Sequence, residues 1–367
     1  MSLNTIVDMN NFFALNNETA LEAREKALRI AFAPIVFQAT RVLRDTGILE
    51  AVSQHRNDGI RLDDLATKVG LPLYGVRVLL ESGLGIGLVL IRDEKYFLTK
   101  TGHFVLHDEF VRVNMDFVHD VCYLGLHALD KSIHTGKPEG LKVFGPWPTI
   151  YEGLSQLSPD IQKSWFAFDH YYSDNSFPQA IVEVFKSSPR RLLDIGGNTG
   201  KWAMACMNYD PTVEVTIMDL PGQLDVARRK ITENGVTERV YFYPANILDE
   251  NQVFPNNFDV IWMSQFLDCF SDVEIISILK RCHQALSEDG CVYILEPFWD
   301  RQRYETAAFC LQQTSLYFTA LANGNSQIYS SDTFLNCVEE AGFDVLEQIE
   351  EIGLSHTLLK LKIKNNS

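Results

Sequence analysis

The stretch Leu192-Leu193-Asp194-Ile195-Gly196-Gly197-Asn198-Thr199-Gly200 decides the fold of this chain. A short apolar run carries a carboxylate near its end, a glycine-rich turn follows, and helical periodicity resumes near Lys201. Glycines let the backbone approach a ligand closely, and a helix N-terminus offers unpaired N–H groups. The stretch therefore predicts a ligand site at the end of a sheet strand, unless the turn only joins the strand to its helix.

Similar short apolar runs recur along the second half of the chain. They follow the run 191–195 at intervals filled by helical periodicity or a loop, at residues 214–218, 240–243, 260–263 and 292–295. This alternation is typical of a parallel sheet covered by helices on both faces. The last two runs, 344–349 and 357–363, leave no room for a helix between them. The expected fold class is therefore α/β, with a mostly parallel sheet whose last strand runs antiparallel.

The first half of the chain predicts helices. Residues 19–46 have apolar residues at helical spacing, with a break or kink expected at Pro34. Short helices and two strands around a turn are then expected at 48–54, 63–69, 74–82, 88–91 and 96–98. Three helices and a hairpin are typical of a winged helix. Residues 103–186 are predicted helical and rich in aromatics, with a loop at 145–148.

Composition excludes several classes of protein. The 367 residues are 46% hydrophobic and 22% charged, which indicates a well-cored protein of about two domains. A net charge of −16 repels phosphate backbones and anionic membranes, so neither partner is expected. The seven cysteines are scattered without a Cys-x-x-Cys pair, so neither disulfides nor a metal site is indicated. Reduced thiols, no signal-like start and no apolar run of about 20 residues favour a cytoplasmic protein.

A second carboxylate narrows the ligand. Asp219 ends the next apolar run and follows Asp194 by 25 residues, which is one strand-helix-strand unit, so it can reach a ribose diol. A dinucleotide fingerprint would place a pyrophosphate against the turn, but Asp194 would repel a pyrophosphate and would instead hold an ammonium. S-adenosylmethionine has an ammonium group and no phosphate. The sequence therefore favours S-adenosyl-L-methionine, with S-adenosyl-L-homocysteine as product, over a nicotinamide cofactor.

The turn from Asp194 to Gly200 resembles the first motif of class I S-adenosylmethionine-dependent methyltransferases. From about residue 28 to 364 the chain resembles the small-molecule O-methyltransferases that have an N-terminal winged-helix dimerisation domain. The matching segments are 39–106, 219–221, 267–272, 296–297 and 341–343. The resemblance implies a Rossmann-like methyltransferase sheet preceded by an all-α and winged-helix part. Its implied divisions are a dimerisation domain at 1–106, a substrate-covering segment at 107–186 and a cofactor domain at 187–367, assembled as a homodimer.

The resemblance also implies the cofactor-binding residues. They are Asp194, Gly196, Gly197, Asn198, Gly200, Asp219, Leu220, Asn246, Ile247, Ser264 and Gln265. Two of them depart from the family pattern, because Asn198 stands where a third glycine is usual and Asn246 where Asp is usual. Asparagine tolerates left-handed backbone better than other non-glycine residues, and an amide can still bond the adenine edge. We therefore expect cofactor binding to survive both departures.

The acceptor side departs further, because Asp268 stands where relatives that methylate phenols commonly carry His. Transfer of a phenol proton, pKa ~10, costs ~8 kcal/mol to an ordinary Asp and ~5 to a His. A raised pKa, a more acidic acceptor or a purely orienting Asp268 all remain open, as does a role as helix N-cap. His170 is the competing base, unless it is simply packed among aromatics. Glu296 is expected to orient a base or to cap the following helix.

Aromatic side chains suggest a flat, apolar acceptor held by stacking. The candidates are Trp165, Phe166, Tyr171, Phe298, Trp299, Tyr317 and Phe318, at least half of which we expect in interdomain packing. The expected function is methyl transfer to a hydroxyl of a small aromatic or polyene-like molecule. A homologue with lost, C- or N-directed transfer is the alternative. A winged-helix regulator is less favoured, because residues 74–82 offer Arg77 as their single basic residue.

Overall fold

The computed structural model describes residues 13–14, 16–235 and 238–364. The chain divides into two compact units, one formed by Leu15–Val118 and the other by His119–Ser367 together with Met1–Ala14. Each unit has its own hydrophobic core.

The unit Leu15–Val118 begins with the long helix α2 (Ala20–Asp45), whose N-terminus is closed by a capping box between Thr19 and Glu22. The helix continues through Pro34, so of the predicted break or kink the break does not occur. The remaining elements are α3 (Ile48–Gln54), β1 (Ile60–Arg61), α4 (Leu62–Val69), α5 (Leu73–Ile86), β2 (Val89–Arg92), β3 (Lys95–Leu98), α6 (Lys100–His107) and α7 (Glu109–Phe117). The strands form a small antiparallel sheet in the order β1-β3-β2.

Packing in this unit follows the apolar spacing of its helices. Leu43, Leu65 and Leu80 are fully buried in one core, whereas the first half of α2 is exposed. Arg44 of α2 donates hydrogen bonds to Asp45, at 2.7 Å, and to Asp116 of α7, at 2.5 Å. In the described part of the chain no single helix is long and apolar enough to cross a membrane, although α4 and α5 pass that test as a pair bent by 115°.

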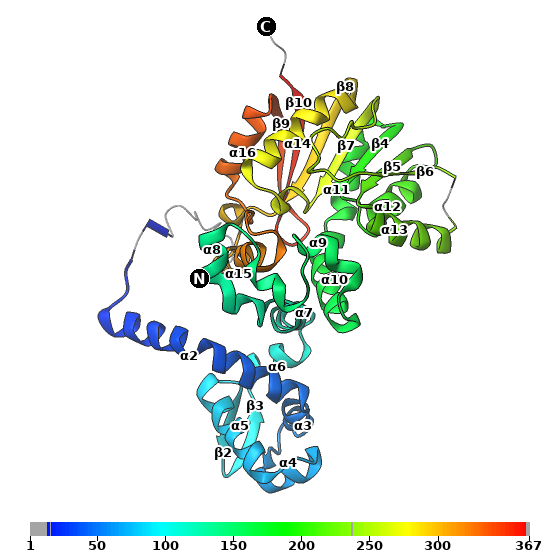
Figure 1. Cartoon of the computed structure of the whole chain (residues 1–367). Helices are drawn as coiled ribbons and strands as arrows, with labels where there is room; N and C mark the ends of the chain where they lie inside the picture. The colour runs from blue at the N-terminus through cyan, green and yellow to red at the C-terminus, as the bar shows by residue number, and fades with distance from the viewer. Residues whose placement is uncertain (1–12, 15, 236–237, 365–367) are drawn as a thin grey trace. The chain divides into compact units, whose positions relative to one another are not determined.

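The other unit contains a seven-stranded sheet in the order β6-β5-β4-β7-β8-β10-β9 (Figure 1). Its strands are β4 (Arg191–Ile195), β5 (Glu214–Asp219), β6 (Val240–Pro244), β7 (Phe258–Ser264), β8 (Leu286–Glu296), β9 (Phe343–Ile352) and β10 (His356–Ile363). Strands β4 to β8 pair in parallel, and β10 pairs antiparallel with both β8 and β9. This topology confirms the predicted α/β fold and the antiparallel last strand.

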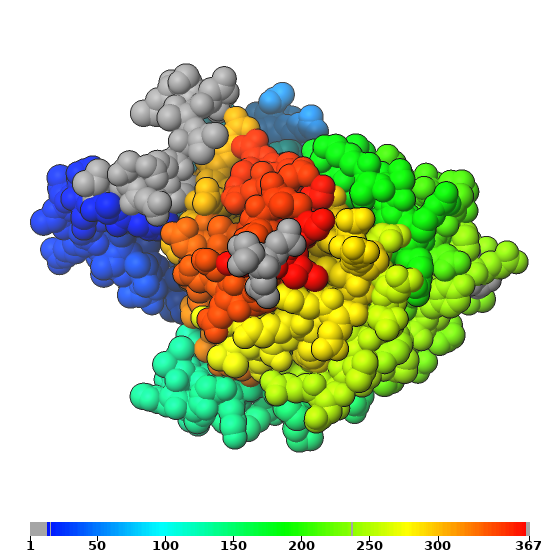
Figure 2. Space-filling model, turned by 90° about the horizontal axis from the view of Figure 1, so that it is seen from above, coloured from blue at the N-terminus to red at the C-terminus, as the bar shows by residue number. Residues whose placement is uncertain are grey.

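Helices cover both faces of this sheet, as the apolar runs predict. On one face lie α11 (Phe177–Val184), α12 (Lys201–Tyr209) and α13 (Pro221–Glu233), and on the other α14 (Asp272–Ala285) and α16 (Ser331–Glu340). Neighbouring residues on a strand face opposite layers, so Trp262 stacks on Trp202 of α12 at 3.9 Å while Met263 packs in the other layer. In Figure 2 the C-terminal segments, orange and red, lie beside the yellow segment that includes α14 and β8.

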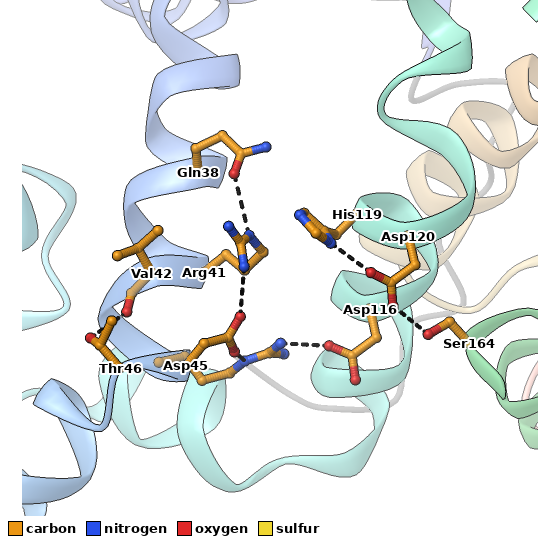
Figure 3. Close-up of polar contacts among 10 residues, drawn as sticks. Gln38, Arg41, Val42, Asp45, Thr46, Asp116, His119, Asp120 and Ser164 are labelled. Carbon is orange, nitrogen blue, oxygen red and sulfur yellow. Dashed lines mark hydrogen bonds and ion pairs between the residues drawn. The ribbon is translucent and has the colours of Figure 1, made fainter. Parts of the chain in front are cut away.

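Short helices precede the sheet and follow β8. They are η1 (Val118–Cys122), η2 (Gly125–Ala128), α8 (Leu129–Thr135), η3 (Glu139–Val143), α9 (Ile150–Gly153), η4 (Leu154–Gln156), α10 (Pro159–Asp174), η5 (Phe185–Ser187), η7 (Trp299–Arg301), α15 (Glu305–Tyr317) and η8 (Phe318–Ala322). The non-helical stretch between η3 and α9 includes the loop predicted at 145–148. Asp120 accepts a hydrogen bond from the hydroxyl of Ser164 at 2.5 Å, and this bond anchors α10 (Figure 3). The other carboxylate oxygen of Asp120 lies 2.6 Å from Nδ1 of His119.

Candidate active site

The turn after β4 is shaped by close approaches that require glycine. Gly196 has φ +73°, and a Cβ there would lie 2.1 Å from the ring of Phe266. A Cβ on Gly197 would lie 2.6 Å from Oδ2 of Asp194. Asn198 itself adopts φ 49°, the left-handed conformation that asparagine tolerates. The turn is therefore a tight cradle between Asp194 and Phe266.

Asp219 is tied to this turn. Its Oδ2 accepts a hydrogen bond from the backbone N–H of Asn198 at 2.9 Å, and its Oδ1 accepts one from Leu220 at 2.7 Å. Burial raises the pKa of Asp219 to about 6, against the effect of these bonds. Each carboxylate oxygen has a further lone pair, so Asp219 can still accept from a ribose hydroxyl.

The cradle and the neighbouring strand ends contain buried polar atoms that have no hydrogen-bond partner among the described residues. These atoms are Oδ2 of Asp194, Oδ1 of Asn198, Oγ1 of Thr199, Oγ of Ser264, Oε1 of Gln265 and Oε2 of Glu296. The residues that carry these atoms lie at or just after the carboxyl ends of β4, β7 and β8, which are neighbouring strands of the sheet. Unpaired buried polar groups are costly, so such a cluster indicates a polar ligand. Oxygen acceptors fit the ammonium and ribose hydroxyls of S-adenosylmethionine.

Asp194 is 2% exposed, and burial, followed by the charge of Asp219, raises its pKa well above the usual value. A cationic group beside it would offset this cost. Asn246 lies on the loop after β6, where its Oδ1 accepts from the backbone N–H of Leu248 at 3.0 Å. Its amide N–H groups therefore remain as the donors it could offer a ligand. Ile247 beside it packs partly against the core.

Asp268 lies on the 3-10 turn η6 (Leu267–Cys269) after β7 and is 6% exposed. Burial raises its pKa to about 7, and the thiol of Cys269 donates to its Oδ1 at 3.4 Å. The N-cap of the following helix α14 is Ser271, which forms a capping box with Glu274. The alternative that Asp268 is the N-cap is therefore wrong.

Glu296 ends β8 and is 2% exposed. Its Oε1 accepts hydrogen bonds from the backbone N–H groups of Phe266 and Leu267, at 3.0 and 2.8 Å. Burial, followed by the charge of Asp268, raises the pKa of Glu296 well above its usual value. These bonds hold the turn that carries Asp268, so Glu296 is bonded to that turn and not to a helix that follows β8.

His170 lies on α10 with Nδ1 at 3.8 Å from Asp169 and 3.7 Å from Asp174. Its ring stacks on Phe166, and Nε2 is buried without a partner in the described structure. Burial, followed by the charge of Lys201, lowers the pKa of His170 to about 4. The imidazole is therefore neutral at pH 7 and a weaker base than a free histidine.

The structure adds residues to this site that the sequence analysis missed. Asp169 accepts a hydrogen bond from Nδ2 of Asn198 at 3.1 Å, and burial, followed by the charge of Asp268, raises its pKa to about 7. Burial, followed by the charge of Cys269, raises the pKa of Tyr151 well above its usual value. No sequence motif joins these residues to Asp268, because α9 and α10 reach the sheet only through tertiary packing.

The aromatic candidates separate into two groups. Phe298 is 1% exposed and packs on Phe334 at 5.2 Å, which places it in the core. The partly buried candidates make ring contacts among themselves and with neighbouring residues: Trp165 with Phe166 (5.1 Å), Tyr171 with Tyr172 (6.3 Å) and Trp299 with Phe13 (5.7 Å). Phe318, 7% exposed, contacts Tyr317 at 5.3 Å, and the Tyr317 hydroxyl accepts a bond from Nε1 of Trp165 at 2.8 Å.

Two models of known protein families match parts of this chain. A dimerisation2-like domain model matches residues 24–96, and an O-methyltransferase domain model matches residues 172–344. The chain therefore carries an O-methyltransferase domain after a dimerisation2-like domain. It is a methyltransferase, and S-adenosylmethionine is its cofactor. Among the described residues of the methyltransferase, no group of three or more His, Cys, Asp or Glu side chains could hold a metal ion.

Individual relatives of this methyltransferase differ in the atom they methylate. An L-tyrosine C(3)-methyltransferase of Streptomyces lavendulae is 24% identical over 320 residues, 86% of this chain and 85% of that protein. A 3-amino-4-hydroxybenzoate 4-O-methyltransferase of Streptomyces cremeus is 24% identical over 248 residues, 66% of this chain and 63% of that protein. The solved O-methyltransferase NcsB1, in complex with S-adenosylmethionine and 2-hydroxy-5-methyl naphthoic acid, is 19% identical, with a TM-score of 0.70 over 95% of this chain and 100% of its own.

Proposed function

We propose that this methyltransferase transfers a methyl group to a hydroxyl oxygen of a small aromatic acceptor, with Asp268 as general base. The observation that carries the proposal is the burial of Asp268 on the turn after β7. Glu296 holds this turn by accepting hydrogen bonds from the backbone N–H groups of Phe266 and Leu267. Burial raises the pKa of Asp268 to about 7, so about half of this carboxyl is deprotonated at neutral pH. General bases work best when their pKa lies near the operating pH.

The raised pKa removes the objection to an aspartate base. A phenol has a pKa of ~10, so transfer of its proton to a carboxylate with a pKa of about 7 costs ~4 kcal/mol. An ordinary aspartate would face ~8 kcal/mol and a histidine ~5. Buried Asp268 therefore matches the basicity of the histidine that is usual in this family. His170, with its pKa lowered to about 4, is the weaker candidate.

In the proposed reaction, a carboxylate oxygen of Asp268 takes the hydroxyl proton of the acceptor. When bound, S-adenosylmethionine supplies an electrophilic methyl group on a sulfonium. The acceptor oxygen forms a bond to that methyl carbon as the sulfur–methyl bond breaks, and S-adenosylhomocysteine is left. Glu296 keeps Asp268 in place by accepting the two backbone N–H bonds of the turn.

The cofactor roles follow the order of the strand ends. We assign Asp219 to the ribose, Asp194 and the glycine turn to the methionine part, and Leu220, Asn246 and Ile247 to the adenine. Ser264 and Gln265 would close the cleft after β7. For the acceptor we favour the partly buried rings of Trp165, Phe166, Tyr171 and Trp299 over Phe298, which lies in the core.

C-methylation is the second candidate, and the match of 86% of this chain to an L-tyrosine C(3)-methyltransferase favours it. Deprotonation of a phenol by Asp268 also makes the neighbouring ring carbon nucleophilic. The same base would therefore serve either atom, and the position of the acceptor relative to the methyl group would decide the product.

The test is incubation with tritiated S-adenosylmethionine and a panel of phenolic acceptors. The panel includes catechols, flavonoids, quinols, hydroxy-polyenes, aminohydroxybenzoates and L-tyrosine, and product NMR distinguishes O- from C-methylation. Turnover by the wild type that Asp268→Asn lowers at least ~100-fold supports the proposal. Asp225→Asn is the matched control, because Asp225 is exposed on α13. Wild-type binding of S-adenosylhomocysteine without turnover on any acceptor would contradict it.

We also propose that the three helices α3 to α5 and the β1-β3-β2 sheet form a winged helix within a dimerisation domain at residues 1–106. The segment 107–186 would cover the acceptor, and residues 187–367 would bind the cofactor. The dimerisation2-like match and the exposed apolar side chains of α2 support a homodimer. The seven cysteines are all free thiols, which supports a cytoplasmic location.

A further inference from the structure

Asn198 does more than complete the turn. Its φ of 49° is a conformation that glycine adopts without strain. Its backbone N–H donates to Asp219 at 2.9 Å, a bond that glycine would make equally well. The backbone therefore does not account for a side chain at this position.

The side chain of Asn198 joins the turn to another element. Its Nδ2 donates to Oδ2 of Asp169 on α10 at 3.1 Å. Five residues further along α10, Asp174 forms an ion pair with Lys201, the first residue of α12. The contacts Asn198–Asp169 and Lys201–Asp174 thus hold α10 against the turn after β4 and the start of α12.

The contact with Asp169 also fixes which end of the amide faces the site. Above a pH of about 7 Asp169 is mostly deprotonated, and a carboxylate only accepts hydrogen bonds, so it selects Nδ2 of Asn198. Oδ1 is then left as an acceptor, and it is buried without a partner in the part of the chain that the structure describes. The reversed amide would present a donor there instead, against the ammonium and hydroxyl donors of the cofactor.

We propose that Asp169 is a positioning residue for cofactor binding: it orients the amide of Asn198 so that Oδ1 accepts a hydrogen bond from an N–H or O–H of S-adenosylmethionine. The inference rests on the cofactor of the proposed function and not on the identity of the acceptor. It also gives a reason for asparagine at the position where the family usually has glycine.

The test is calorimetric titration of the full-length chain with S-adenosylhomocysteine. We expect Asp169→Ala and Asn198→Gly each to weaken binding about tenfold, the loss of one hydrogen bond to a charged or buried group. The double variant should bind no more weakly than Asn198→Gly alone, because Asp169 acts through Asn198. Asp169→Asn should recover part of the affinity, since its amide oxygen can still accept from Nδ2. Asp160→Asn, an exposed change on the same helix, is the matched control and should leave binding unchanged.

Independent effects that multiply to about a hundredfold in the double variant would overturn the proposal, as would unchanged binding by Asp169→Ala. Thermal melting of the ligand-free variants shows whether they are folded. A variant that binds more weakly because it is partly unfolded would also count against the proposal. Wild type that binds S-adenosylhomocysteine but transfers no methyl group would contradict the transfer reaction and leave this inference standing. Wild type that does not bind S-adenosylhomocysteine would overturn both.

Discussion

Oε1 of Glu296 lies 2.8 Å from the backbone nitrogen of Leu267, so the last residue of β8 holds the turn that carries Asp268. A residue that acts through the turn should affect catalysis more than cofactor binding. We expect Glu296→Ala to lower kcat about 100-fold, since a mispositioned base loses most of a general-base contribution. Glu296→Gln, whose amide oxygen still accepts both N–H bonds, should lose less than about tenfold. Steady-state kinetics with the best acceptor measures both, and equal losses in the two variants would contradict the positioning role.

Asp268 should account for the acidic limb of the pH profile. A general base is active when deprotonated, and burial places the pKa of Asp268 at about 7. We therefore expect kcat/KM to fall about tenfold per pH unit as the pH drops below about 7. Asp268→Asn should lower kcat by about 10²–10⁴ with little change in the Kd of S-adenosylhomocysteine.

Asp268→His provides the complementary comparison, because an unperturbed histidine has a pKa of ~6.5. It should retain much more activity than Asp268→Asn. A profile that stays flat from pH 5 to pH 8 in the wild type would argue against proton abstraction by this residue.

His356 should make the fold sensitive to acid. It is 1% exposed, lies 3.1 Å from the hydroxyl of Ser176, and burial lowers its pKa to about 4. Between pH 6.5 and pH 4 this histidine binds a proton in the unfolded chain but not in the folded one, so its contribution to stability falls as the pH falls through this window. The loss at pH 5 amounts to about 2 kcal/mol relative to pH 7.

His356→Gln should reduce that loss, although the substitution itself lowers stability at every pH. Denaturant titrations at pH 7 and pH 5 compare the two proteins, with the exposed His134→Gln as control. The prediction fails where the difference in unfolding free energy between the two pH values is the same in both chains.

The exposed apolar side of α2 should be the dimer contact. Leu21, Leu28, Phe32 and Ile35 are 54% to 66% exposed and lie on one side of the helix at a rotation of about 100° per residue. Light scattering should give twice 41.7 kDa for the wild type. Leu28→Asp with Phe32→Asp should give 41.7 kDa, because a buried unpaired charge opposes association. Ala23→Asp, on the opposite side of α2, is the control, and a monomeric wild type would end the proposal.

The sequence predicted those site residues that lie at or near the ends of strands. The glycine turn follows β4, Asp219 ends β5 and Asp268 lies on the turn after β7. These strands have a clear apolar pattern, and parallel strands bring their carboxyl ends to one edge. Asp169 and Tyr151 were missed because they lie on helices whose periodicity says nothing about which strand end they approach. Phe298, by contrast, was expected among the acceptor rings, and packing against Phe334 places it in the core.

Local pattern alone determined the order of helices and strands, because alternating apolar runs allow few ways to bury themselves. It also determined the carboxylate and the glycine turn that we assign to the cofactor. Tertiary structure alone decided the chemistry of Asp268. A pKa depends on water, charges and hydrogen bonds around the group. Burial raises the pKa of Asp268, and the charge of Asp268 in turn raises the pKa of Asp169 on α10 and of Glu296 on β8. Residues far apart along the chain thus create an environment in which an aspartate can serve as the base.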